Sequence, residues 1–139
     1  MNVVVTSGGF DPVHSGHISY FENAKKLGDI LIVGVNSDAW LIRKKGKAFM
    51  PFKERVAVVK AIRHVDYVFP FNDDDGSAKD LIELVKMLHP NDNIIVANGG
   101  DRNENNNSEE GVDGVKFVFG VGGTHKMNSS SDILKRWKE

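Results

Sequence analysis

Five short apolar runs, rich in β-branched residues, alternate along the chain with amphipathic stretches. Unbroken runs of this kind are typical of parallel strands that are buried on both faces. The predicted strands cover residues 3–5, 30–35, 65–69, 94–97 and 115–119. The spacing of apolar residues between them predicts helices from Ser15, from near Ala39, over 52–62, from Ser77, and in the final stretch with Ile133, Leu134 and Trp137.

The same pattern predicts which residues cap the helices and which residues of a helix face the core. Asn36, Ser37 or Asp38 is expected to cap the second helix, and Pro51 to stand at the entry of the third. Ser77 is expected to cap the fourth helix, and one of Ser129 to Ser131 the last. The fourth helix is expected to face inward with Leu81, Leu84, Val85 and Leu88.

Strands that alternate with helices predict an α/β fold, a doubly wound five-stranded parallel sheet with right-handed crossovers. Such sheets bind ligands outside the carboxyl ends of their strands. Polar and glycine-rich segments follow the predicted strands at 7–17, 36–47, 98–103 and 122–131. We therefore expect these segments to converge on one site.

The first of these segments follows the sequence VVVTSGGFDPVHSGH, residues 3–17. Gly8 and Gly9 permit a tight turn and a close approach of the backbone to a ligand. His14 lies just before the predicted helix, and His17 lies in its first turn. A helix N-terminus carries unpaired N–H groups and a partial positive charge, so this turn is a candidate phosphate site.

Composition narrows the class of protein. The 139 residues suit a single domain, residues 1–139, and the net charge of −1 gives no general attraction to nucleic acid or membranes. The absence of cysteine excludes disulfides, thiolate metal sites and a cysteine nucleophile. The sequence begins with a core strand rather than a signal peptide and has no run long enough to span a membrane, which predicts a cytoplasmic protein.

Three polar stretches each allow two interpretations. RKKGK, residues 43–47, is either a solvated surface or part of an anion site. NDDDG, residues 72–76, has turn chemistry, with a metal site as the alternative. RNENNNSEEG, residues 102–111, is a mobile loop or lid, or is disordered.

The glycine turn does not match the common nucleotide-binding fingerprints. Phe10, Asp11 and Pro12 follow the glycines, so G-x-G-x-x-G is absent, and no P-loop lysine pattern occurs. Hydride transfer and Walker-type kinase activity lose their main support. A pair of imidazoles at a helix start, a basic segment and a hydroxyl-rich terminal helix start suit an anionic ligand.

The segment GGFDPVHSGH resembles the H-x-G-H signature of the nucleotidyltransferase superfamily, in particular the cytidylyltransferase-like enzymes. Examples are glycerol-3-phosphate cytidylyltransferase and the adenylyltransferase that acts on heptose 1-phosphate. The resemblance continues in order through LGDILIVGVNSD, the basic segment, FKER, IRHVDYV, NGGD and the terminal serines, which is nearly the whole chain. It implies the Rossmann-like fold of that superfamily.

The resemblance implies transfer of a nucleotidyl group, CMP or AMP, from a nucleoside triphosphate to a phosphorylated sugar or polyol, with release of pyrophosphate. Mg²⁺ is expected with the triphosphate, held by phosphate oxygens and water. A homodimer without nucleic acid or membrane partners is expected from relatives. LGDILIVGVNSD is more like the heptose-phosphate enzymes and the short length more like the glycerol-phosphate enzyme, so base and acceptor stay open. A catalytically silent nucleotide-binding module is the alternative, against which the intact histidine pair argues.

The resemblance assigns the family's site residues to the residues at matching positions in this sequence. His14 and His17 are expected to contact the triphosphate and stabilise the transition state, with Lys44 or Lys45 reaching the phosphates. The residues expected to bind the nucleotide are Ser7, Gly8, Gly9, Phe10, Gly16, Gly99, Gly100, Asp101, Ser129, Ser130 and Ser131. Those expected at the acceptor are Asp11, which orients the loop or the substrate, Arg55, Arg63 and Lys126. No side chain is assigned as a metal ligand.

The sequence departs from the family's motifs at two places, and these departures limit what the resemblance says about the base and the acceptor. Cytidylyltransferases commonly carry R-T-E-G-I-S-T-T where this chain has THKMNSSS, so His125 or Lys126 is expected to replace the missing arginine charge. The asparagine-rich loop after Asp101 is the second departure. The choice of base and acceptor therefore depends on residues 98–131.

Overall fold

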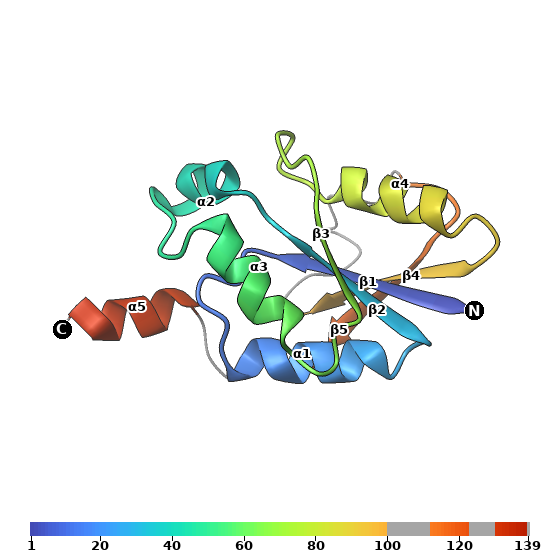
Figure 1. The fold of residues 1–139 in the computed structure, drawn as a ribbon, viewed down its shortest axis with the longest axis horizontal. Helices are drawn as coiled ribbons and strands as arrows, with labels where there is room; N and C mark the ends of the chain where they lie inside the picture. The colour runs from blue at the N-terminus through green and yellow to red at the C-terminus, as the bar shows by residue number, and fades with distance from the viewer. Residues whose placement is uncertain (100–111, 123–129, 139) are drawn as a thin grey trace.

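A computed structural model of the chain describes residues 1–99, 112–122 and 130–138. Strands and helices alternate along most of the chain (Figure 1). The strands are β1 (Asn2–Gly8), β2 (Ile30–Val35), β3 (Tyr67–Pro70), β4 (Asn93–Gly99) and β5 (Lys116–Val121). The helices are α1 (Ser15–Lys25), α2 (Asp38–Lys45), α3 (Phe52–Lys60), α4 (Lys79–Leu88) and α5 (Ser130–Lys138).

The five strands form one parallel sheet in the order β3-β2-β1-β4-β5. The chain therefore winds outward in both directions from β1, which confirms the predicted doubly wound sheet. Figure 1 shows α1 and α3 on one face of the sheet and α4 on the other. The order reverses between β1 and β4, and this switch point is where such sheets bind ligands.

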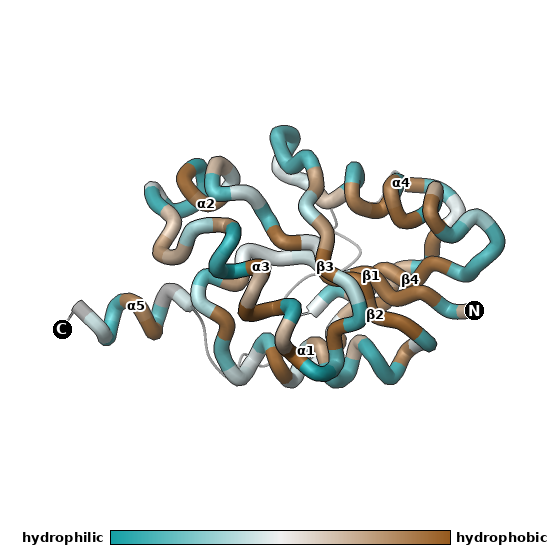
Figure 2. Tube along the Cα trace, in the orientation of Figure 1, coloured by the Kyte–Doolittle hydropathy of each residue, from teal (hydrophilic) through white to brown (hydrophobic). Residues whose placement is uncertain are grey.

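The core has two layers because side chains alternate across the sheet. Val4 packs with Phe21 of α1 and Val59 of α3 on one face. Val3 and Val5 pack with Leu81 and other residues of α4 on the opposite face. The central strands form the most continuously hydrophobic part of the trace (Figure 2), as the apolar runs predicted.

Strand β3 begins two residues later than predicted, at Tyr67 rather than Val65. The backbone N–H of Val65 donates to the carbonyl of Ile62, so the turn after α3 continues through Val65. The N–H of Asp66 donates to Leu31 of β2, and the ladder proper follows.

Helix α4 corrects two predictions. It begins at Lys79 with Ala78 as the N-cap, one residue after the predicted Ser77, although the Ser77 hydroxyl donates to Asp75 and also accepts the backbone N–H of Lys79 at 3.3 Å. Leu88 is 53% exposed, whereas Ile82, which was not predicted to face inward, is fully buried. Helix α4 ends at Leu88 with its last backbone hydrogen bond in place, from the N–H of His89 to the carbonyl of Val85 at 2.9 Å.

Other boundaries differ by a few residues. Ser37 is the N-cap of α2, Pro51 is the N-cap of α3 without a side-chain hydrogen bond, and α3 ends at Lys60. Strand β1 extends to Gly8, β4 to Gly99, and β5 covers Lys116–Val121. The predicted loop or lid at 102–111 lies outside the described residues.

No helix within the described ranges has the length and hydrophobicity that a bilayer crossing requires.

Candidate active site

The connection from β1 to α1 is shaped by the side chain of Phe10. Phe10 has a positive φ of 51°, which is uncommon for a residue with a side chain, and is 4% exposed. A Cβ atom at Gly8 would lie 2.8 Å from the Phe10 ring, and one at Gly9 would lie 2.9 Å from Leu41 of α2. The two glycines therefore let protein side chains pack directly onto the turn that leads to His14.

His14 and His17 cap α1 reciprocally. Nδ1 of His14, the N-cap residue, accepts from the backbone N–H of Gly16 at 3.0 Å. Nδ1 of His17 accepts from the backbone N–H of His14 at 3.2 Å. The rings stack with centroids 3.9 Å apart. Two histidines thus perform the exchange that Ser/Thr and Glu perform in the usual capping box.

These hydrogen bonds assign the tautomers. Since Nδ1 accepts in both His14 and His17, each ring in its neutral form carries its proton on Nε2 and can donate from that atom. The His17 and Phe10 rings also pack in a T-shaped arrangement, with centroids 5.0 Å apart and planes at 82°. Burial, and secondly the proximity of His14, lowers the pKa of His17 to about 3. His17 is therefore a neutral hydrogen-bond donor at physiological pH.

The N-terminus of α1 keeps its partial positive charge, because the first turn contains no acidic residue. The N–H of Gly16 is already bonded to His14. Ser7 lies one residue before the end of β1, opposite Gly34 of β2. The predicted nucleotide residues of the first block therefore lie together at the carboxyl end of β1.

Lys45 reaches this turn from the end of α2. Its ammonium lies 3.2 Å from the carboxylate of Asp11 and donates to the Asp11 carbonyl at 3.0 Å. Asp11 is 2% exposed, and its carboxylate oxygens accept the backbone N–H groups of Phe49 and Met50, each at 2.7 Å. Asp11 therefore ties the segment after α2 to the glycine turn.

Lys44 lies over an aromatic ring. Its ammonium lies 4.6 Å from the centroid of the Trp40 ring, on the same helix. Of the two lysines that the sequence left open, Lys45 has a described contact with the β1–α1 turn.

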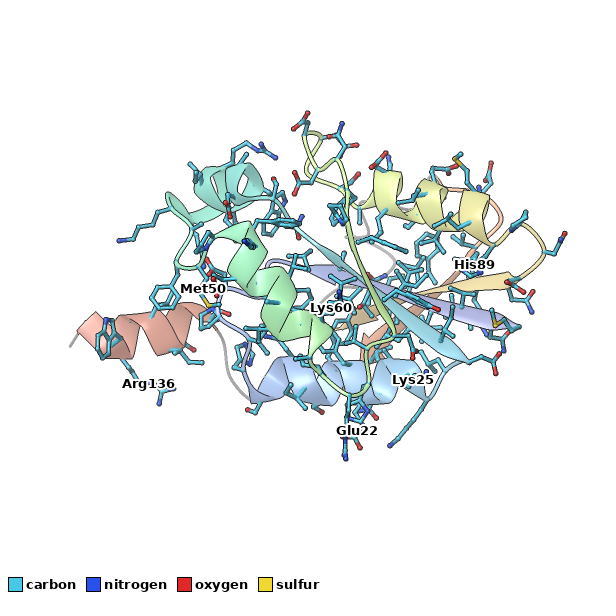
Figure 3. The ribbon with its side chains drawn as sticks, in the orientation of Figure 1. Glu22, Lys25, Met50, Lys60, His89 and Arg136 are labelled. Atoms are coloured by element: carbon cyan, nitrogen blue, oxygen red, sulfur yellow. The ribbon has the colours of Figure 1, made fainter. Side chains whose placement is uncertain are left out.

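Arg55, an expected acceptor residue, is fully buried beneath the site. Its Nη1 donates to the carbonyls of Gly9 and Asn36 at 2.8 and 2.7 Å. Its Nε donates to Met50 at 3.0 Å, and its Nη2 binds the carboxylate of Asp38 at 2.7 Å. Met50, the partner of Nε, lies close to the start of α3, on the side of the molecule from which α5 extends (Figure 3). Arg55 thus joins the glycine turn, the end of β2 and the entry to α3.

Arg63, the second expected acceptor arginine, is exposed in the turn after α3. Helix α3 begins on the site side and leads to the start of β3, so Arg63 lies at the amino ends of the strands. The structure does not bring Arg63 to the histidines within one chain.

The C-terminal helix begins beside the turn. The Ser130 hydroxyl donates to the carbonyl of Pro12 at 2.7 Å, which places the start of α5 next to the histidine loop. Ser131 is the second residue of α5. The other predicted residues of these blocks, Gly100, Asp101, His125, Lys126 and Ser129, lie outside the described residues.

Gly99 lies at the end of β4, where α1 crosses closely. A Cβ atom at Gly99 would lie 3.1 Å from the Tyr20 ring and 3.1 Å from the carbonyl of Val121. The Tyr20 hydroxyl donates to the carbonyl of Ala97. A side chain at position 99 would therefore crowd the packing between α1, β4 and β5.

The three aspartates of NDDDG do not form a metal site. Asp73 binds Asn36 and Ser37, and Asp75 binds Ser77. Across the part of the chain that the structure describes, no three acidic or histidine side chains are grouped so as to hold a metal ion. The Mg²⁺ expected with the triphosphate stays a prediction.

Sequence reasoning missed four residues that build the site: Tyr20, Asn36, Asp38 and Asp73. Asn36 and Asp38 were considered only as helix caps, and Asp73 only as a turn residue or metal ligand. The available signal was a run of polar residues directly after two strands, which predicts proximity at one sheet edge. It does not indicate which side chains pair.

Comparison with known proteins identifies the family. Residues 5–136 match the model of the cytidylyltransferase-like family. The chain is 38% identical over 132 residues to the bifunctional protein HldE of Photorhabdus laumondii, and 40% identical over 123 residues to HldE of Hahella chejuensis. These matches cover 94% and 87% of this chain but only 25% and 23% of the relatives, so the chain spans about a quarter of their length.

Solved structures have the same fold. A lipopolysaccharide core biosynthesis protein from Thermoplasma volcanium superposes with a TM-score of 0.68 and 25% identity, covering 92% of this chain and 99% of that one. A bifunctional NMN adenylyltransferase/ADP ribose pyrophosphatase from Francisella tularensis, complexed with AMP and manganese, gives a TM-score of 0.69 at 13% identity. It covers 98% of this chain and 41% of the other, and supports the fold alone. With the family model spanning nearly the whole chain, this protein belongs to the cytidylyltransferase-like family of nucleotidyltransferases.

Proposed function

We propose that this protein transfers a nucleotidyl group, AMP or CMP, from a nucleoside triphosphate to a phosphorylated sugar or polyol. An oxygen of the acceptor phosphate attacks the α-phosphorus, the bond from that phosphorus to the β-phosphate oxygen breaks, and pyrophosphate leaves. An acceptor phosphate is already ionised near neutral pH, so no general base is required. Catalysis then depends on positioning and on stabilising the charge that develops on the phosphoryl oxygens.

The reciprocal cap formed by His14 and His17 carries the proposal. It holds two imidazoles at a helix N-terminus, and because Nδ1 of each ring accepts from the backbone, the donor that each ring can offer is Nε2–H. Such donors stabilise phosphoryl oxygens without taking a proton from the reaction. The Lys45 ammonium adds a positive charge on the same turn. When Mg²⁺ enters with the triphosphate, it neutralises part of the phosphate charge.

The structure also suggests roles for the remaining expected residues. Asp11 and Arg55 have their polar atoms engaged by protein partners, so we assign both to holding the turn rather than to contacting the acceptor. Ser130 is assigned to the phosphate side of the site because its hydroxyl lies on Pro12. Relatives named HldE and a lipopolysaccharide core biosynthesis protein favour a sugar phosphate as acceptor. A homodimer in the cytoplasm stays a prediction, and light scattering measures the dimer.

The decisive experiment measures pyrophosphate release with Mg²⁺ and each of four nucleoside triphosphates against a panel of sugar and polyol phosphates. We expect release with one donor and one acceptor class, and a nucleotide–sugar or nucleotide–polyol product by mass spectrometry. No release with any pair, together with thermal stabilisation by a nucleotide, would support a silent binding module instead. A ligand at 100 times its dissociation constant stabilises by about 2.7 kcal/mol, which is readily measured.

A further inference from the structure

Asp73 is a buried carboxylate that the proposed reaction does not use. It follows β3 by three residues, and its side chain is 2% exposed. Asp74 and Asp75 beside it are exposed. A buried carboxylate is costly unless its oxygens are hydrogen-bonded, so its partners indicate what it does.

Among the described residues, the hydrogen bonds to the Asp73 carboxylate come from the turn between β2 and α2, and the Arg43 guanidinium lies 3.9 Å from it. One oxygen accepts the backbone N–H of Ser37 at 2.8 Å and the amide of Asn36 at 3.0 Å. The other accepts the Ser37 hydroxyl at 2.7 Å. Burial alone would raise the pKa of Asp73, but these hydrogen bonds outweigh burial and hold its pKa below the usual range. The carboxylate is therefore charged and fully engaged.

Asp73 fixes α2 at two places. Ser37 is the N-cap of α2, and its oxygen accepts the N–H of Trp40 at 3.1 Å. A hydroxyl has one proton, so donation to Asp73 directs its lone pairs toward Trp40. Further along the helix, Arg43 donates to the backbone carbonyl of Asp73 at 2.8 Å. One residue thus sets the start of α2 and also bonds its second turn.

Helix α2 carries that placement to the site. Leu41, 3% exposed, packs against Gly9, and Lys45 ends the helix against Asp11. An eight-residue helix is short and stiff, so a shift at its N-cap moves Lys45 as well. Misplacement of a catalytic group by about 1 Å can cost about 10²-fold in rate.

We propose that Asp73 is a positioning residue, which holds α2 through Ser37 and Arg43 so that Lys45 lies on the phosphate-binding turn. That Asp73 holds α2 in place follows from its contacts with Ser37 and Arg43 alone. Its consequence for turnover rests on the proposed nucleotidyl transfer, in which Lys45 faces the phosphates.

The test compares Asp73→Asn with Asp74→Asn, which removes the same charge one residue away at an exposed position. If the amide nitrogen of residue 73 takes the place that faces the Ser37 N–H and the Asn36 amide, both donors lose their acceptor. In the other orientation the Ser37 hydroxyl must turn and accept from the amide, so its proton no longer goes to residue 73, and in both cases the charge is lost. We expect amide hydrogen exchange in α2 to accelerate about tenfold in Asp73→Asn and to stay unchanged in Asp74→Asn. Equal exchange in the two variants would overturn the proposal. If Asp73→Asn does not fold, Ser37→Ala breaks the same contact from the other side.

Kinetics test the link to Lys45 by a double-mutant cycle. We expect Asp73→Asn to lower kcat/KM about tenfold in the wild-type background and less than about twofold when Lys45 is already replaced by Met. A merely structural defect would lower kcat/KM by the same factor in both backgrounds, and that result would contradict the link. If no donor and acceptor pair supports turnover in the wild type, the proposed function fails, while hydrogen exchange still decides whether Asp73 places α2.

Discussion

The ammonium of Lys45 lies 3.2 Å from the carboxylate of Asp11, thirty-four residues earlier in the chain. That carboxylate is at the same time the acceptor for the backbone N–H groups of Phe49 and Met50. The pair therefore joins the glycine turn to the segment that follows α2. This contact of Lys45 is the basis for expecting different roles for the two adjacent lysines.

The adjacent lysines are expected to differ in catalysis. Lys45→Met removes the positive charge on the β1–α1 turn, and we expect kcat/KM to fall by about 10²-fold, as for loss of one electrostatic contact to the transition state. Lys44→Met removes a cation from the Trp40 ring, and its effect should stay within about threefold. Pyrophosphate release measures both, with exposed Lys47→Met as the control. Equal losses at Lys44 and Lys45 would contradict the assignment.

His14 combines a cap with a proposed catalytic role, and substitution separates them. His14→Ala removes the cap and should lower the free energy of unfolding by about 1 kcal/mol. His14→Asn restores a good N-cap and should restore most of that stability, but not turnover. Urea denaturation and pyrophosphate release give the two quantities. Wild-type turnover in His14→Asn would reduce His14 to a helix cap.

His17 is expected to matter for turnover far more than for folding. His17→Ala should keep the fold, because the interior remains packed around Phe10 and Phe21, and should lower kcat by about 10²-fold to 10³-fold. Circular dichroism checks the fold and pyrophosphate release checks the rate. Unchanged turnover in this variant would rule out the proposed mechanism.

The lowered pKa of His17 predicts a stability change in acid. The native state has a pKa of about 3, while the unfolded state titrates near 6.5, so the unfolded state binds more protons between these values. His17 therefore lowers stability as the pH falls from 6.5 toward 3, by up to about 1.4 kcal/mol per pH unit. Urea denaturation across this range should give a smaller slope for His17→Gln. His64→Gln, in the turn before β3, is the control, and equal slopes in the two variants would contradict the assignment.

The two arginines expected at the acceptor should behave differently. Arg55→Met leaves the carbonyls of Gly9 and Asn36 without their buried donor, and should lower the free energy of unfolding by about 3 kcal/mol or more. Arg63→Met, at an exposed position, should change it by less than about 0.5 kcal/mol. Urea denaturation compares them. Similar small effects would contradict the structural role of Arg55.

The sequence by itself determined the framework of the fold and the class of chemistry. The apolar run 30–35 matches the bounds of β2, and α1 starts at the predicted Ser15, because these signals are local: β-branched runs, a glycine turn and helical spacing. His14 and His17 were found as candidates because three-residue spacing places both at one helix start. The polar segments that follow the strands then predicted that these residues meet at the carboxyl ends of the strands.

Only the tertiary structure decided which polar residues pair at that edge. Arg55 binds Gly9 across 46 positions, and Asp73 binds Asn36 across 37. A periodic pattern contains no information about such partners, since they depend on the register of strands and the placement of whole helices. For the same reason Arg63, which resembles a site residue in sequence, lies at the amino ends of the strands, away from the site. Likewise Lys45 reaches Asp11, while Lys44 lies over the Trp40 ring. Local patterns specify elements, and the packing of those elements assigns each charge its partner.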